Sequence, residues 1–299
     1  MTEANGPEAD GGVTTTETGF EHPTATETED ETTWWRQMSV VAGQEYHLSI
    51  RNRWAFALTG LFILLAGLLT VFSGSRVGPS GFDVMVVSLA SLATYLIPLA
   101  ALVFGYDAIV GADQEGWLDV VFALPVARST VVFGKYLGRA VTLTAATAIG
   151  FGAAGVLLLL QLGLVNWGAY ATFLLSAVGV GLAFLAMSVL ISSLAAEKTH
   201  ALGIALVVWL WFVLVHDLVA LGVISVLKLP SEVLSAFVLA NPADIFRVIV
   251  LQSVEARGGG FAAVFSGTEL SLPILVVGLV AWCVVPVLVA GRLVSRRSL

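Results

Sequence analysis

The sequence predicts an all-α integral membrane protein with six transmembrane helices, an interfacial helix before the first span and a short cytoplasmic helix between the second and third spans. This prediction rests on six long apolar stretches, a composition that is 58% hydrophobic and a mean hydropathy of +0.93. A hydrocarbon core of roughly 30 Å requires about 20 apolar residues in a helix, and each stretch is long enough. The stretches cover residues 54–73, 84–106, 140–164, 168–196, 201–227 and 270–291.

Charge divides the chain into a short tail and one membrane domain. Residues 1–33 hold nine acidic residues and no lysine or arginine, whereas the rest of the chain has 14 basic and 12 acidic residues, a net charge of +2. A tail rich in threonine, glutamate and glycine cannot bury enough apolar area to offset its ordering entropy. We therefore expect a disordered acidic cytoplasmic tail over residues 1–33 and one membrane domain over residues 34–299, without a soluble catalytic module.

The distribution of basic residues predicts the orientation of the chain. An even number of spans places both termini on one side, and cytoplasmic loops carry an excess of lysine and arginine. With the termini inside, ten basic residues are cytoplasmic and four are external. No apolar run precedes residue 54, so a cleaved signal peptide is not expected. We expect a multi-pass protein of the plasma membrane with both termini in the cytoplasm.

Residues 34–53, ahead of the first span, mix aromatic, apolar and basic side chains. Trp34, Trp35 and Tyr46 accompany Arg36 and Arg51 in this segment. The mixture is typical of a helix that lies in the inner membrane interface with its rings at headgroup depth. The alternative is an ordinary basic flank of a transmembrane helix.

The longest predicted cytoplasmic loop joins the second and third spans and has a clear pattern. Trp117, Val121 and Leu124 fall on one face of a short helix, and Pro125 ends it. Ser129 is then expected to cap a new helix that continues into the third span. A short amphipathic helix beneath the membrane suits the transmission of force from a soluble partner. The alternative is a helix that lies on the lipid surface.

Three short elements of this loop resemble the first cytoplasmic loop of ABC-2 type transporter permeases. They are Gln114-Glu115-Gly116-Trp117-Leu118, Leu124-Pro125-Val126-Ala127-Arg128 and Gly134-Lys135-Tyr136-Leu137. The family has an acidic pair with Glu-Gly-Thr, a Leu/Ser-Pro-Val-x-Arg element and a Gly-Lys-Tyr/Phe element at similar spacing. Trp117 stands where the family usually has threonine, so the start of the short helix can differ here.

A second resemblance lies in the long outer segment before the sixth span. Residues Asn241-Pro242-Ala243-Asp244-Ile245-Phe246-Arg247 are similar to an Asn-Pro-x-Asp-x-Phe-Arg signature. This signature occurs in the ABC-2 subgroup that includes the maturation permease of nitrous oxide reductase. The resemblance marks an outer-segment motif that consists of Asn241, Pro242, Asp244 and Arg247.

The resemblance implies the permease subunit of an ATP-binding cassette exporter, in which two permeases, identical or different, pair with two ATPase subunits. The chain has no Gly-x-x-x-x-Gly-Lys-Ser/Thr phosphate loop. ATP and Mg²⁺ are therefore expected on the separate ATPase, and the chain itself is expected to be neither an enzyme nor a cofactor carrier. Membrane lipid is an expected partner and nucleic acid is not. The apolar spans fit an amphipathic or lipid-like cargo.

Under this resemblance, the residues of the cytoplasmic loop couple the permease to the ATPase and do not catalyse a reaction. Arg128 and Lys135 have an alternative role as basic anchors at the inner end of a span. The expected coupling residues are Gln114, Glu115, Gly116, Trp117, Leu118, Pro125, Arg128, Gly134 and Lys135.

Two polar residues, His216 and Asp217, interrupt the fifth apolar stretch. Ionisable groups inside a bilayer are costly, so they are functional candidates. At about 1.5 Å per residue the pair lies roughly 22 Å from the inner edge, near the outer headgroups. We expect the span to end at this pair. Residues 218–227 are then expected to form an outer re-entrant or interfacial element. The pair is then a candidate for the outer mouth of the translocation path.

Two other function classes remain open. A secondary transporter or channel needs no ATPase, but it usually places charged or broken-helix sites at the midplane, and the first four spans have none. An intramembrane protease would use Gly78-Pro79-Ser80-Gly81 with His216 as the base, but this serine lies in a predicted loop. The subgroup resemblance does not imply copper transport, because copper needs soft ligands and the spans offer only the well-separated Met85, Met187 and Cys283, so no metal site is expected.

Overall fold

The computed structural model describes residues 28–73, 79–116, 127–163, 166–226, 230–254 and 270–296. Within these ranges the chain is helical and contains no strand. Six of the described helices are long and apolar enough to cross a membrane. The predicted all-α membrane fold is thereby confirmed. The short cytoplasmic helix predicted around Trp117–Leu124 lies outside the described residues.

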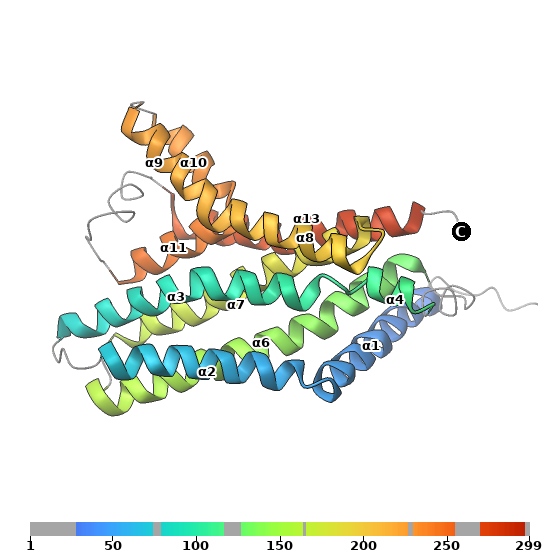
Figure 1. The fold of residues 1–299 in the computed structure, drawn as a ribbon, viewed down its shortest axis with the longest axis horizontal. Coiled ribbons are helices and arrows are strands. Elements are labelled where there is room, and N and C mark those ends of the chain that lie inside the picture. The colour runs from blue at the N-terminus through green and yellow to red at the C-terminus, as the bar shows by residue number, and fades with distance from the viewer. Residues whose placement is uncertain are drawn as a thin grey trace, which may run out of the picture.

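The six spanning helices run along one long axis of the molecule (Figure 1). They are α2 Trp54–Ser73, α3 Pro79–Gly105, α6 Arg128–Leu162, α7 Trp167–Leu194, α8 Lys198–Leu210 with its continuation, and α13 Leu272–Arg296. α6 begins well before the apolar stretch at residue 140, so its polar first turns extend beyond the apolar part of the span. α13 ends at the same end of the bundle at which α1 begins, as an even number of spans requires (Figure 1).

α7 is the most buried of the spanning helices and forms the centre of the bundle. It contacts α3, α6 and α13 as well as α11, which spans Pro242–Ser253. A Cβ atom added at Gly179 would lie 2.6 Å from Leu279 Cδ2, and one added at Gly181 would lie 3.0 Å from Ile97 Cγ2. Small residues at these positions let α13 and α3 approach the backbone of α7 closely.

α1, which spans Thr28–Arg51, packs along the first half of α6 (Figure 1). The helix begins inside the segment of residues 1–33 that the sequence predicts to be disordered. The sequence at this point is Thr-Glu-Asp-Glu, and the macrodipole of a helix favours negative charge at its N-terminus. The acidic end of the tail is therefore compatible with a helix.

Two glycines of α6 make this packing possible. A Cβ atom added at Gly134 would lie 2.7 Å from the Cβ atom of Val41. One added at Gly138 would lie 2.5 Å from the carbonyl oxygen of Ala42, a backbone atom that cannot rotate away. The distance between α1 and α6 is therefore set by the absence of side chains at Gly134 and Gly138.

Replacing Gly138 with alanine is expected to push α1 away from α6 and to lower the free energy of unfolding by about 1–3 kcal/mol, a usual cost of overpacking. The measurement is the thermal unfolding midpoint of the purified protein in detergent. Gly152→Ala on the same helix is the matched control, because a Cβ atom there meets nothing within 4 Å. Equal midpoints for the two variants would contradict the close packing of α1 on α6.

The fifth span does not end at His216 and Asp217, contrary to the expectation from the sequence. α8 continues through a π-helical turn, η1 (Trp211–Val215), into α9 (His216–Val226). The two residues are only 6% exposed each, because partners on α11 surround their side chains. Their polarity is satisfied inside the protein, so the helix can continue past them.

Two shorter helices follow the fifth span. They are α10, Ser231–Leu239, and α11, Pro242–Ser253, with a bend of 112° between them. α9 and α10 extend away from the other helices, whereas α11 lies against α7 (Figure 1). The bend at Asn241 therefore returns the chain to the bundle before the last span.

Candidate functional site

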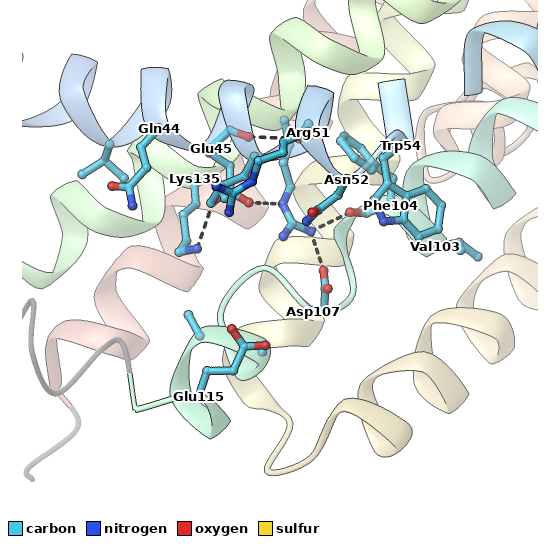
Figure 2. Close-up of a pocket in the computed structure, with 16 residues that line it drawn as sticks. Gln44, Glu45, Arg51, Asn52, Trp54, Val103, Phe104, Asp107, Glu115 and Lys135 are labelled. Carbon is cyan, nitrogen blue, oxygen red and sulfur yellow. Dashed lines mark hydrogen bonds and ion pairs between the residues drawn. The ribbon is translucent and has the colours of Figure 1, made fainter. Parts of the chain in front are cut away.

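Charged side chains gather where α1, α6 and the end of α3 meet (Figure 2). Glu45 of α1 binds two bases of α6, with Lys135 Nζ 3.1 Å from Oε2 and Arg139 Nε 2.6 Å from Oε1. Arg139 Nη1 also donates hydrogen bonds to Asp107 Oδ1 and to the carbonyl oxygen of Phe104, both at 2.6 Å. We call Glu45, Asp107, Lys135 and Arg139 the inner network.

The inner network is largely buried, and Glu45 is only 6% exposed. Burial alone raises the pKa of Glu45, but Arg139 and Lys135 outweigh it and hold the pKa of this carboxyl below its ordinary value. Glu45 is therefore charged at neutral pH. Removing one partner of a buried ion pair leaves an uncompensated charge, which is costly. The network thus fixes α1 against α6 and against the end of α3.

Two serines of α7 hold the last turn of α3 and the start of α4, Val110–Gln114. Ser192 Oγ accepts hydrogen bonds from the amides of Ile109 and Val110, at 2.9 and 3.1 Å. Ser188 Oγ donates to the carbonyl oxygen of Leu102 at 2.7 Å. The bonds of Ser192 attach α4 to α7, the most buried of the spanning helices, and the bond of Ser188 attaches α3 to the same helix. Sequence reasoning missed both serines, and their spacing of one helical turn in an apolar stretch was the available signal.

The first predicted coupling residues lie at the end of α4 and directly after it. Gln114 ends this helix, and Glu115 Oε1 accepts a hydrogen bond from Lys198 Nζ at 2.8 Å. This exposed ion pair joins the loop to the start of α8. Gly116 has a φ of +68°, in the left-handed region that favours glycine. The predicted residues Trp117, Leu118 and Pro125 lie outside the described residues.

The other predicted coupling residues belong to α6. Arg128 is its first residue, and its N-cap is Ala127 without a side-chain hydrogen bond, so the prediction that Ser129 caps the helix is wrong. Ala127 has an extended backbone and the helix begins at the next residue, Arg128. Ser129 therefore lies inside the first helical turn, not at the N-cap. Gly134 is in the contact with α1, and Lys135 is in the inner network. Both residues support the packing of α6 on α1.

At the opposite end of the bundle, the two polar residues of the fifth span meet the outer-segment motif. Arg247 Nη1 lies 2.7 Å from both carboxylate oxygens of Asp217 and 3.2 Å from Asp244 Oδ1. His216 Nδ1 lies 2.9 Å from Asp244 Oδ2. Sequence reasoning identified both groups but did not predict their contact. We call His216, Asp217, Asn241, Asp244 and Arg247 the outer cluster.

Asn241 connects the start of α11 to the π-helical turn of the fifth span. Its Oδ1 accepts a hydrogen bond from the amide of Ala243 at 2.9 Å, which caps α11, and Pro242 occupies the first turn. Its Nδ2 donates to the carbonyl oxygen of Phe212 in η1 at 2.8 Å. A π-turn alters the regular helical hydrogen bonds and often marks a functional site. Here it presents a carbonyl oxygen to the fully buried Asn241.

The outer cluster also contains groups that could hold a metal ion. His216 Nδ1 and the carboxylate oxygens of Asp217 and Asp244 all lie within 4.8 Å of one another. Arg247 already lies between the two carboxylates and supplies their counter-charge. In this arrangement the cluster is an ion-paired joint between the fifth span and α11.

Comparison with known proteins assigns the chain to a family. The family described as "ABC-2 family transporter protein" matches residues 39–299. The chain belongs to the ABC-2 transporter family. It is 38% identical over 269 residues to "Probable ABC transporter permease protein NosY" of Stutzerimonas stutzeri, which covers 86% of this chain and 97% of that protein. The protein of the same name from Pseudomonas aeruginosa strain PAO1 is 36% identical over 269 residues, with 87% of this chain and 98% of that protein covered.

These matches confirm the resemblance seen in the sequence and show an ABC transporter permease subunit, which is a multi-pass membrane protein. The ABC-2 match begins at residue 39, so it includes both clusters and leaves out the acidic segment 1–33. Glu45 and Asp107, which the sequence analysis did not single out, therefore lie inside the ABC-2 domain together with the predicted Lys135 and Arg247. The family assignment leaves the roles of these residues to be proposed from their geometry.

Proposed function

We propose that this ABC-2 permease is an exporter subunit that couples ATP hydrolysis on a separate ATPase to movement of substrate across the plasma membrane. ATP and Mg²⁺ belong to the ATPase, and two permeases, identical or different, complete the transporter. Both termini lie in the cytoplasm in this proposal. The observation that carries it is the attachment of residues 107–116, which follow α3, to three different helices of the bundle.

Each attachment of this segment reaches a different helix. Asp107 binds Arg139 of α6, the amide of Val110 binds Ser192 of α7, and Glu115 binds Lys198 of α8. A force that an ATPase applies near residues 114–128 would therefore act on three spans directly. A loop that served only to connect two helices would not need these contacts.

The fifth span links the two ends of the molecule. It begins at Lys198, which binds Glu115 of the loop between the second and third spans (residues 107–139, here called the coupling loop), and it carries His216 and Asp217 of the outer cluster toward its other end. We propose that the outer cluster closes the outer end of the translocation path and opens when the fifth span moves relative to α11. The cargo that suits the apolar spans is amphipathic or lipid-like, moved outward.

A pull-down of the tagged chain from detergent tests the ATPase coupling. Wild type is expected to recover an ATPase, and the double variant Glu115→Arg, Trp117→Ala is expected to lose it, because one charge of the coupling loop is reversed and its aromatic ring is removed. The matched control is Glu232→Arg, Trp211→Ala, which changes an exposed acid and an exposed tryptophan (51%) toward the other end. The control is expected to retain the ATPase.

The same experiment separates the proposal from the remaining alternative. An ATPase that is absent with every variant, including wild type, favours a secondary transporter or channel. Loss of the ATPase with the control as well as with the loop variant would contradict a specific coupling site, because the control leaves the segment 107–139 unchanged.

A further inference from the structure

A cavity of about 310 Å³ lies beside the inner network, between α1, the end of α3, α4 and α6 (Figure 2). Its volume is at the lower end of the range for small-molecule sites. Its apolar wall includes Trp54 and Phe104, and its polar wall includes Arg51 and Arg139 together with the amide side chains of Gln44 and Asn52. The cavity therefore combines an apolar side with a set of hydrogen-bond donors.

The polar wall stands where the apolar runs end. Arg139 directly precedes the third apolar stretch, Asp107 directly follows the second, and Asn52 stands two residues before Trp54 at the start of the first. Tryptophan and basic residues at the ends of spans lie at the depth of the lipid headgroups. The cavity therefore lies at the depth of phospholipid phosphates, and the exposed side chains of Arg51 and Asn52 make it reachable from outside the protein.

The charges around the cavity leave one positive group without an opposite charge. In the described part of the chain, three bases pair with the three acids that line the cavity. The pairs join Lys135 and Arg139 to Glu45, Arg139 to Asp107, and Lys198 to Glu115. Arg51 also lines the cavity, and it forms none of the ion pairs found in that part of the chain.

Several hydrogen-bond donors on the wall are also available. The hydrogen bonds of Arg139 run from Nε and Nη1, so its Nη2 is left for another acceptor within the described residues. The side chains of Gln44 and Asn52 form no hydrogen bond in the same part of the chain. Guanidinium groups bind phosphate with paired, charge-assisted hydrogen bonds.

We propose that this cavity binds one phosphate group, held by Arg51 and the free side of the Arg139 guanidinium. The phosphate is that of an anionic phospholipid headgroup or of a free phosphate compound, since both present the same acceptor oxygens. The inference rests on the membrane arrangement of the spans and does not depend on an ATPase partner.

Binding to the delipidated full-length protein in an uncharged detergent tests this proposal. The probes are phosphatidylglycerol, diacylglycerol without a phosphate, and inorganic phosphate, with native mass spectrometry and the thermal midpoint as readouts. Phosphatidylglycerol is expected to bind and stabilise the protein, and diacylglycerol is not. Saturable stabilisation by inorganic phosphate to the same extent would assign the site to a free phosphate compound.

Three variants locate the site. Arg51→Gln is expected to weaken phosphatidylglycerol binding by about tenfold or more, the effect of losing a hydrogen bond to a charged group. Arg51→Lys keeps the charge but loses the paired hydrogen bonds of a guanidinium, so its affinity is expected to lie between those of wild type and Arg51→Gln. Arg53→Gln is the matched control, because Arg53 is an exposed base two residues away that does not line the cavity. Equal losses for Arg51→Gln and Arg53→Gln, or equal binding of diacylglycerol, would overturn the proposal.

Discussion

Replacing Arg247 with glutamine is expected to lower the free energy of unfolding by about 3–5 kcal/mol, the usual cost of breaking a buried ion pair from one side. Arg247 Nη1 lies 2.7 Å from Asp217 and 3.2 Å from Asp244, and Asp244 is fully buried. Without the guanidinium, the two buried carboxylates lose their arginine counter-charge, and Asp244 keeps its contacts with His216 and with the Asn241 amide. Chemical unfolding of the purified protein in detergent, followed by tryptophan fluorescence, measures the loss.

A second substitution tests the origin of this loss. The double variant Asp217→Asn, Arg247→Gln removes one charge of each sign, so it is expected to be more stable than Arg247→Gln alone. With Asp217→Asn as the second single variant, these proteins form a double-mutant cycle, in which effects that do not add indicate a direct interaction. Glu232→Gln on α10 is the control, because this exposed acid is expected to change stability by less than about 0.5 kcal/mol. An Arg247→Gln variant as stable as this control would contradict the ion-paired joint.

Binding of the ATPase at the coupling loop is expected to be unaffected by these changes in the outer cluster. Arg247 lies at the opposite end of the bundle from Glu115, so Arg247→Gln is expected to retain the ATPase in the pull-down. Transport is expected to change, because the joint between the fifth span and α11 is loosened. Loss of the ATPase from folded Arg247→Gln protein would show that the two ends are not separable in this way.

The spans could be predicted from the sequence because the bilayer fixes their length and polarity. The fifth span shows the limit of that argument. His216 and Asp217 predicted an end to the span, because unpaired polar groups are costly in a membrane. The prediction was wrong because this cost depends on the partners of the polar groups. Those partners, Asn241 and Arg247, are 25 and 30 residues away along the chain, and a hydropathy pattern does not contain their contact.

The inner network was beyond sequence reasoning for a related reason. From the sequence, Lys135 was interpreted as a coupling residue or a basic anchor. Glu45 was not identified as a candidate, because it lies among the aromatic and basic residues of α1. Their ion pair depends on how closely α1 approaches α6, which Gly134 and Gly138 permit. In the sequence, glycines that allow a close helix contact cannot be distinguished from other small residues of a membrane helix. The position of the neighbouring helix is needed to recognise them.

Replacing Glu45 with glutamine is expected to destabilise the protein by about 3 kcal/mol or more, because Lys135 and Arg139 would lose their shared counter-charge inside the protein. Glu45 binds both bases, at 3.1 and 2.6 Å, and is 6% exposed. The matched control is Glu115→Gln. That acid lines the same cavity but forms one exposed ion pair, with Lys198, and such pairs contribute about 0–1 kcal/mol. Equal effects of the two variants would contradict the buried network.

The pH dependence of stability gives this prediction a second readout. The pKa of Glu45 lies below its ordinary value because of Arg139 and Lys135, which outweigh the effect of burial. Its charge therefore stabilises the fold fully above the ordinary glutamate pKa of about 4.3, and this contribution is lost as the pH falls through the lowered value. The difference in unfolding midpoint between wild type and Glu45→Gln is expected to stay constant between about pH 6 and 8 and to shrink below about pH 4. A difference that persists unchanged in acid would mean that the charge of Glu45 does not stabilise the contact between α1 and α6.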